Sequence, residues 1–198
     1  MIPSDLVLQN NNTCLRPTKK EDYESFLRLA KDEDAWNYFT LNLSQPDQLS
    51  TWMEAAFREK ENNIRRPFTI IDKNSGFIAG STSLGNISFH DLRLEIGWSW
   101  LGKEFRSTGI NRQCKFLLMQ YSFETLQFER VEFKTDKLNA RARKGLEKIG
   151  GVEEGVMRSH MTMWNSRRRD SVYYSVLKRE WPMLKQTIFK DLAADENH

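Results

Sequence analysis

The segment LGKEFRSTGIN at residues 101–111 joins an expected strand to an expected long helix. Before it, residues 94–101 alternate large apolar side chains with smaller or polar ones. After it, residues 109–126 repeat apolar side chains at three- and four-residue spacing. The first N–H groups of a helix have no partner within the helix, and the helix dipole places partial positive charge there. Gly109 permits close backbone approach or a positive φ angle. The segment therefore has the physical features of an anion site.

Two interpretations of this segment are about equally supported by physics alone. In the first, the hydroxyl groups of Ser107 and Thr108 and the charges of Lys103 and Arg106 help to bind a phosphate. In the second, Thr108 merely caps the helix and Arg106 is a solvated loop cation. The segment has neither the Lys-Ser/Thr pair of a phosphate loop nor the G-x-G-x-x-G spacing. A simple nucleoside triphosphate or dinucleotide site is therefore weakly supported.

Three more helices are expected from local signals. One follows the capping-box pattern Thr18-x-x-Glu21, a second follows Ser44-x-x-Asp47, and both continue with apolar residues on one face. Another begins near Asn139 and ends at the two glycines 150–151.

Strands are expected between these helices. They cover residues 14–17, 68–72, 77–84, 94–101, 131–136, 155–164 and 171–177, with a hairpin turn at 73–76. The strands on either side of helix 109–126 should be parallel, because a helix of that length is a crossover connection. The other strands should be mostly antiparallel. We therefore expect an α/β fold with a mixed sheet and helices on both of its faces.

Composition limits the class of protein. The 198 residues suit a single domain, expected at residues 1–190, with a polar tail at 191–198 that should fray. The net charge of +3 is too small to argue for a nucleic-acid partner, and the arginines at 167–169 are expected at the solvated tip of the last hairpin. The two cysteines and three histidines show no metal spacing, so no metal is expected. Neither a secretory signal nor a membrane span is recognisable, and we expect a cytoplasmic protein without a membrane partner.

The run EIGWSWL at 95–101, followed by Glu104-Phe105-Arg106-x-x-Gly109, resembles the cofactor motif of the GNAT acetyltransferases, in particular their RimJ/RimL-like branch. The family signature Arg/Gln-x-x-Gly-x-Gly/Ala corresponds here to Arg106-Ser-Thr-Gly109-Ile-Asn111. The segments 130–136, Asn139 to Gly150, and 169–175 with Trp181-Pro182 after them are similar to the same branch. The resemblance covers nearly the whole chain.

This resemblance implies a site for acetyl-CoA, the acyl donor. The strands at 94–101 and 130–136 should splay apart, and the pantetheine arm should lie between them along the backbone of Ser99, Trp100 and Leu101. The pyrophosphate should lie on the N–H groups of Arg106, Ser107, Thr108, Gly109, Ile110 and Asn111. Asn139 should hold the inner end of the cofactor, although its side chain is equally suited to a plain N-cap.

The implied reaction is direct transfer of an acetyl group to a primary amine, on a protein N-terminus, a lysine or a small molecule. Glu95 is the candidate base. Simple alternation along the strand places it on the same face as Gly97 and Ser99, and places Trp98 and Trp100 on the opposite face. An ion-paired, partly exposed structural carboxylate is an equally good interpretation. Freed N–H groups at a bulge near 98–100 would stabilise the oxyanion. Relatives often carry Ser where this chain has Ala142, which leaves the general acid unassigned.

The sequence leaves two alternative functions and two open points. An acyl-CoA-binding protein of the same fold with little or no turnover is the main alternative to an enzyme. A nucleic-acid adaptor is a distant third. The connection between the first two helices, with Trp36, Tyr38 and Phe39, either lines the acceptor pocket or packs as ordinary core. The oligomeric state, a homodimer included, stays open.

Overall fold

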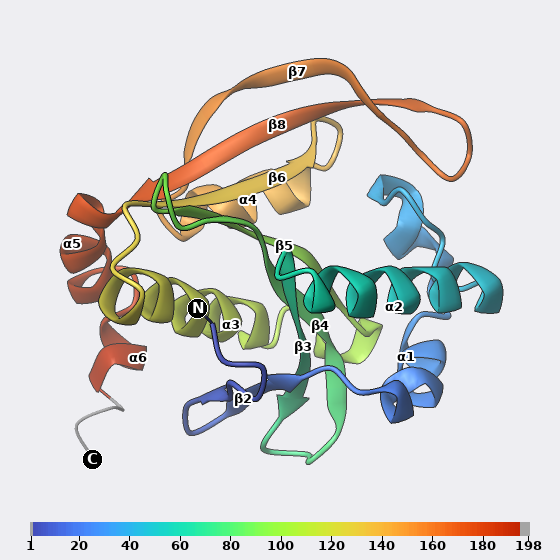
Figure 1. Ribbon diagram of the computed structural model, residues 1–198, viewed down its shortest axis with the longest axis horizontal. Coiled ribbons are helices and arrows are strands. Elements are labelled where there is room, and N and C mark those ends of the chain that lie inside the picture. Colours follow the sequence, from blue (N-terminus) through green and yellow to red (C-terminus); the bar gives the residue numbers. More distant parts are fainter. Residues whose placement is uncertain (1, 195–198) are drawn as a thin grey trace.

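One mixed sheet organises the computed structural model, which describes residues 2–194 (Figure 1). Its eight strands in this part of the chain lie in the order β1-β2-β3-β4-β5-β6-β8-β7. They are β1 (Leu8–Gln9), β2 (Thr13–Pro17), β3 (Arg65–Asp72), β4 (Ile78–Ser88), β5 (Arg93–Leu101), β6 (Arg130–Asp136), β7 (Val152–Thr162) and β8 (Arg168–Leu177). Only β5 and β6 pair in parallel, and the other neighbouring pairs are antiparallel. The predicted fold class is confirmed.

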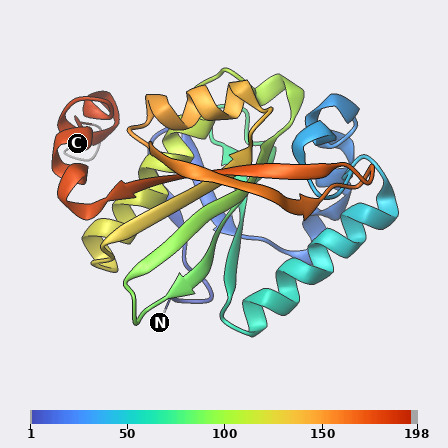
Figure 2. The same cartoon turned by 90° about the horizontal axis from the view of Figure 1, so that it is seen from above.

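Helices cover both faces of the sheet (Figures 1 and 2). They are α1 (Tyr23–Leu29), α2 (Pro46–Glu61), α3 (Ile110–Gln120), α4 (Ala140–Lys148), α5 (Trp181–Gln186) and α6 (Lys190–Ala194), with 3₁₀ turns η1 (Lys20–Asp22), η2 (Glu33–Tyr38), η3 (Lys103–Phe105) and η5 (Lys178–Glu180), and a π turn η4 (Tyr121–Thr125) that extends α3. Alternate residues of β3, β5 and β6, among them Phe68, Ile96 and Phe133, form one core with α3, α5 and α6. A second, aromatic core joins α1, η2 and α2 to Trp100 on the other face.

The parallel pair β5–β6 separates along its length. The two strands pair only where Arg93–Glu95 lies beside Arg130–Glu132, although β5 continues to Leu101 and β6 to Asp136. Their ends therefore diverge, as predicted, and the backbone of the two diverging segments is not used in pairing between them.

A β-bulge in β5 changes which face each residue occupies. Alternate residues of β4 pair in turn with Glu95, Gly97 and Trp100 of β5. The step from Gly97 to Trp100 is one residue longer than the matching step in β4, and Trp98, within it, has a φ angle of 51°. A bulge of this kind reverses the alternation beyond it. The prediction that opposed Glu95 to Trp100 and placed it with Ser99 was therefore wrong: Trp100 lies on the Glu95 face and Ser99 on the α3 face.

Several predicted boundaries also need correction. Helix α2 begins after Gln45 with Pro46 in its first turn, so Ser44 does not cap it. The expected box at Thr18 and Glu21 is not formed, and Asp22 instead accepts a hydrogen bond from the Lys19 N–H at 2.9 Å.

The fraying predicted for residues 191–198 is wrong for residues 191–194. These residues belong to α6, which buries Leu192 in the core and pairs Asp191 with Arg112. The remainder of the predicted tail lies outside the described residues.

Candidate functional site

The connection from β5 to α3 exposes a row of backbone donors. Ser107 and Gly109 have φ angles of 65° and 93°, and Gly109 is the N-cap of α3. None of the N–H groups of residues 107–111 donates a hydrogen bond to another described residue. A Cβ atom added at Gly109 would meet no atom within 4 Å. The mouth of α3 is therefore open, and its unpaired N–H groups and helix dipole suit an anion.

Two side chains of this connection hold it in place. The Arg106 Nε atom donates to the Leu101 carbonyl at 3.0 Å, and its guanidinium forms an ion pair with Asp32. The Thr108 hydroxyl donates to the Phe105 carbonyl at 2.8 Å. The interpretation of Arg106 as a solvated cation is therefore wrong, because its charge is compensated by Asp32, the N-cap of η2, and this pair fastens the connection to the segment between α1 and η2.

The predicted cofactor-binding residues on the diverging part of β5 differ in the groups that they expose to a ligand. The Trp100 ring is buried among Phe26, Trp36 and Trp52, and its Nε1 group is buried with no hydrogen-bond partner among residues 2–194. At the surface, this residue offers a ligand backbone groups. The Ser99 hydroxyl lies 2.8 Å from the Thr82 hydroxyl on the opposite face. Of the predicted helix-mouth residues, Ile110 is buried in the core and Asn111 is exposed. Backbone groups, rather than side chains, are thus what this part of the site offers.

Asn139 is the N-cap of α4, just beyond the end of β6. Its Oδ1 atom accepts a hydrogen bond from the Ala142 N–H at 3.0 Å, as the capping prediction required. Its Nδ2 group donates to no described residue, so one side chain caps the helix and keeps a free donor.

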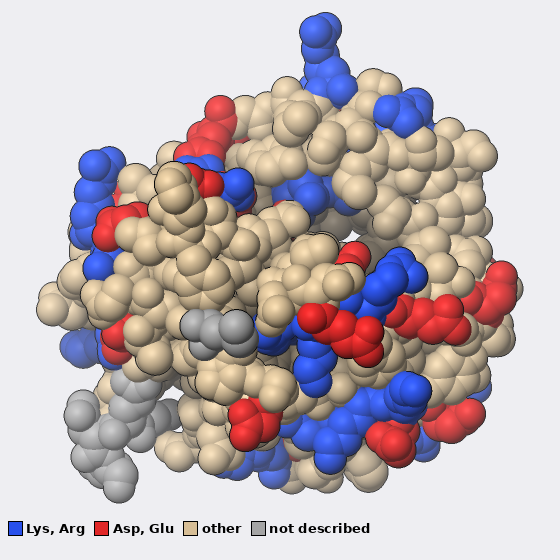
Figure 3. Space-filling model, in the orientation of Figure 1, with Lys and Arg blue, Asp and Glu red and all other residues tan. Residues whose placement is uncertain are grey.

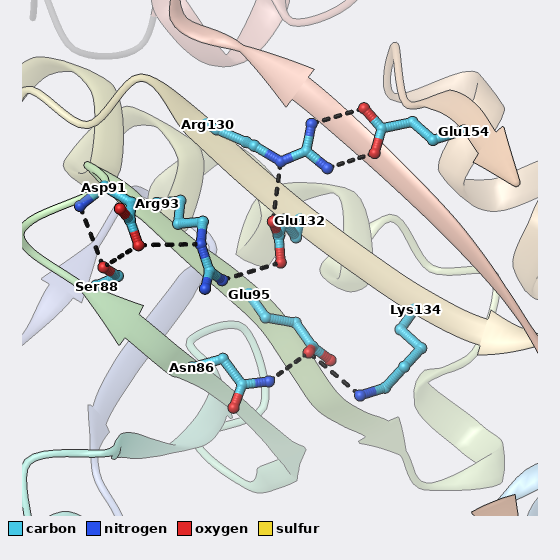
Figure 4. A network of polar contacts seen from close by, with 9 residues as sticks. All are labelled: Asn86, Ser88, Asp91, Arg93, Glu95, Arg130, Glu132, Lys134 and Glu154. Carbon is cyan, nitrogen blue, oxygen red and sulfur yellow. Dashed lines mark hydrogen bonds and ion pairs between the residues drawn. The ribbon is translucent and has the colours of Figure 1, made fainter. Parts of the chain in front are cut away.

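Glu95 lies where the pairing of β5 and β6 ends (Figure 4). It is only 4% exposed, and its Oε2 atom accepts hydrogen bonds from Asn86 Nδ2 at 2.7 Å and Lys134 Nζ at 3.3 Å. A Cβ atom at residue 97 would lie 2.8 Å from Glu95 Oε1, so Gly97 makes room for this carboxylate. The ion pair was anticipated as an alternative, but Glu95 is buried rather than partly exposed.

A network of ion pairs connects the strands at the closed end of the parallel pair, the end at which β5 and β6 are hydrogen-bonded to each other (Figure 4). Arg93 of β5 and Arg130 of β6 both contact Glu132, at 3.6 and 2.9 Å. Arg130 also pairs with Glu154 of β7. The charges at this end neutralise one another, and they fix β5, β6 and β7 where β5 and β6 are still paired.

Lys115 is a residue of the site that the sequence did not single out. It is 5% exposed, its Nζ atom donates to the Ser99 hydroxyl at 3.0 Å, and it lies 5.4 Å from the centre of the Phe133 ring. The ammonium thus lies between residues of the two diverging strands, on the α3 face. Burial lowers the pKa of Lys115 to about 8.

Replacing Lys115 with Met is expected to stabilise the protein at pH 7. In the folded state the pKa of Lys115 is lowered from 10.5 to about 8, so its ammonium destabilises the fold below pH 8 by roughly 3 kcal/mol, at about 1.4 kcal/mol per pH unit. Between pH 8 and 10.5 the unfolded chain binds the proton more strongly, so wild-type stability should rise with pH. Urea unfolding of both proteins at pH 7 and pH 10 measures this. A Lys115→Met protein that is less stable at pH 7 would contradict it.

The tip of the β7–β8 hairpin is fastened to η2. Trp164 Nε1 donates to the Trp36 carbonyl at 3.0 Å, and Arg167 donates to the Asn37 carbonyl and pairs with the buried carboxylate of Asp136. Figure 3 shows a hollow on this face, between the hairpin and α2. The arginines at 167–169 are not the solvated tip that the sequence predicted, because only Arg168 of the three extends outward, where it bonds Ser159 and Thr162.

The part of the chain from residue 2 to 194 contains no group of three or more His, Cys, Asp or Glu side chains placed to hold a metal ion. No helix in the same range is long and apolar enough to cross a membrane.

Known proteins share both the sequence and the fold. Residues 12–152 match the model of the acetyltransferase (GNAT) domain. The "Putative ribosomal N-acetyltransferase YdaF" of Bacillus subtilis (strain 168) is 31% identical over 78% of this chain and 92% of its own length. A GCN5-related N-acetyltransferase from Brucella melitensis has a TM-score of 0.86 at 26% identity, over 95% of this chain and 86% of that one. RimJ of Mycobacterium smegmatis shares the fold, with a TM-score of 0.78 at 18% identity over 92% of each chain. The chain therefore belongs to the GNAT family and is an N-acetyltransferase.

Proposed function

We propose that this N-acetyltransferase takes its acetyl group from acetyl-CoA and transfers it directly to a primary amine. One observation carries the proposal: the unpaired N–H groups of residues 107–111 directly follow β5, at the end where β5 and β6 diverge and no longer pair. A phosphate-bearing donor with a long, narrow arm fits both features. Members of the GNAT family use acetyl-CoA in general, which supports the same donor.

The residues present are suited to this donor. The N–H groups of Ser107, Thr108, Gly109, Ile110 and Asn111 would hold the pyrophosphate, which needs donors and partial positive charge rather than a free cation. The predicted Arg106 N–H is not among them, because it donates to the Lys103 carbonyl at 3.3 Å. The backbone of Ser99, Trp100 and Leu101 would pair with the pantetheine arm. The free Nδ2 group of Asn139 would donate to its inner end. The bound thioester supplies an acetyl carbon that an amine can attack.

Glu95 would act on the acceptor amine. Lys134 and Asn86 hold its Oε2 atom, which leaves Oε1, beside Gly97, to accept a proton or to bind the ammonium. Backbone N–H groups at the Trp98 bulge would stabilise negative charge on the carbonyl oxygen. The C–N bond forms as the C–S bond breaks, so no covalent bond to the protein is required.

Asn139→Asp separates the two roles of Asn139. An aspartate keeps the oxygen that caps α4 but loses the amide donor. We expect unchanged thermal stability and an affinity for CoA lower by roughly fivefold to tenfold, the loss of one hydrogen bond. Titration calorimetry with CoA, beside a melting curve, measures both. Equal affinity in the two proteins would leave Asn139 with the capping role alone.

A binding protein of the same fold with little turnover is the second candidate, favoured by Ala142, where relatives resembling this chain often carry Ser. A thiol-release assay with acetyl-CoA and a panel of peptides and amines separates the two. The enzyme is expected to raise thiol release with at least one acceptor. CoA binding with release that never exceeds background hydrolysis would refute the proposed function.

A protein is the favoured acceptor. YdaF, the relative at 31% identity, bears the name of a ribosomal N-acetyltransferase, and we extend that acceptor class to this chain as part of the proposal. Peptides with free N-termini therefore belong in the assay, together with lysine side chains and small amines.

A further inference from the structure

Arg169 is a buried cation without an ion-pair partner. It is 7% exposed, and its Nε atom has no hydrogen-bond partner among residues 2–194. Within the same residues, its side chain makes a single, long hydrogen bond of 3.4 Å to the Tyr38 carbonyl. No carboxylate oxygen of residues 2–194 lies within 4.0 Å of its guanidinium. Burial accordingly lowers the pKa of Arg169. Holding a desolvated charge without a partner is costly, and proteins seldom do so without a function.

The carboxylates near Arg169 are engaged elsewhere. Asp136 pairs with Arg167 and also accepts the Leu138 N–H. Glu95 pairs with Lys134. This part of the site therefore holds three cations and two carboxylates, and Arg169 is the cation left over.

Arg169 shares the sheet face on which Glu95 lies. In β8, Ser171 and Tyr173 are opposite Asp136 and Lys134 of β6, so residues 169, 171 and 173 face the same side as those two. Glu95 lies near enough for its charge to act on that of Arg169. An acceptor amine at Glu95 would therefore have, on the same sheet face, a guanidinium that contacts no carboxylate of residues 2–194.

We propose that Arg169 binds a carboxylate of the acceptor, so that the preferred acceptor is an amine with an acidic group a few bonds away. The proposal rests on the proposed function, and it names the substrate class of the same site. Glu95 binds the amine end, and Arg169 supplies the charge-assisted hydrogen bonds that a carboxylate accepts. A carboxylate of this kind is found on a peptide with an acidic second residue and on a free amino acid.

The test compares matched acceptors on the full chain with acetyl-CoA. Two tetrapeptides differ only by Glu or Gln at position two, and a second pair consists of free aspartate and asparagine. We expect kcat/KM to be roughly tenfold to hundredfold higher for the acidic member of at least one pair, mainly through KM. Preference within the peptide pair identifies a peptide as the source of the carboxylate, and preference within the amino-acid pair identifies a small molecule.

Variants assign the preference to Arg169. Arg169→Gln should lose it and Arg169→Lys should retain part of it. The matched control, Arg168→Gln on the outward face of the same strand, should keep it in full. Calorimetry of peptide binding in the presence of CoA gives the same comparison without turnover, and melting curves verify folding.

Two results would overturn the inference. Equal use of acidic and neutral acceptors by the wild type does so without any variant, and it leaves the transferase function standing. A preference that survives in folded Arg169→Gln does so as well. A failure of the proposed function looks different, because no acceptor then raises thiol release at all.

Discussion

Gly109→Asp is expected to abolish acetyl-CoA binding in a chain that still folds. The space above Gly109 is open, so the new Cβ atom meets no protein atom within 4 Å. Its carboxylate would instead stand among the N–H groups that are proposed to hold the pyrophosphate, where it competes for the donors and repels the phosphates. We expect CoA affinity to fall by at least 100-fold, about 3 kcal/mol. Titration calorimetry measures the change.

Two controls separate charge from backbone strain. Gly109 has a φ angle of 93°, which strains any L-residue, but asparagine tolerates it better than most, so Gly109→Asn isolates the negative charge. Gly76 has a φ angle of 77° and equally open surroundings, at the β3–β4 turn, so Gly76→Asp repeats the strain outside the β5–α3 connection. Both should bind CoA much better than Gly109→Asp. Unchanged affinity in folded Gly109→Asp would show that the cofactor lies elsewhere.

Glu95→Gln is expected to lower turnover by roughly 100-fold or more, the usual contribution of a positioned general base. The amide keeps the size of the side chain and its contact with Asn86, so CoA affinity should change by less than about threefold. Steady-state kinetics with one good acceptor, together with CoA titration, separates kcat from cofactor binding.

Glu132→Gln is the matched control for Glu95. Glu132 pairs with Glu95 across β5 and β6, lies on the same sheet face, and contacts arginines at the closed end of the strands. Its substitution should lower stability slightly and change turnover by no more than about twofold. If Glu95→Gln turns over at the wild-type rate, Glu95 is a structural partner of Lys134 and no base.

Local signals predicted the parts of the site that depend on one short segment. Gly109 before an apolar repeat indicated the mouth of α3, and Asn139 before another indicated the cap of α4. The divergence of β5 and β6 followed from the family resemblance. The point at which the two strands diverge, after Glu95, is known only from the register of their pairing in the structure.

Features that depend on a single backbone angle or on distant pairing were not predictable. Simple alternation predicted Ser99 on the same face as Glu95. The positive φ angle at Trp98 reverses this pattern, and no residue type in the sequence indicates that angle. The Arg106–Asp32 pair joins residues 74 positions apart. Lys115 is not on the apolar stripe of α3, yet it is buried, because sheet and C-terminal helices enclose that helix on several sides.

A crystal structure of the chain with CoA tests the central claim most directly. We expect the pyrophosphate on the N–H groups of residues 107–111, the pantetheine arm between β5 and β6 beside Ser99–Leu101, and the sulfur near the Trp98 bulge within reach of the Glu95 face. A CoA molecule bound at another surface, with the mouth of α3 left free and β5 and β6 not in contact with it, would contradict the account.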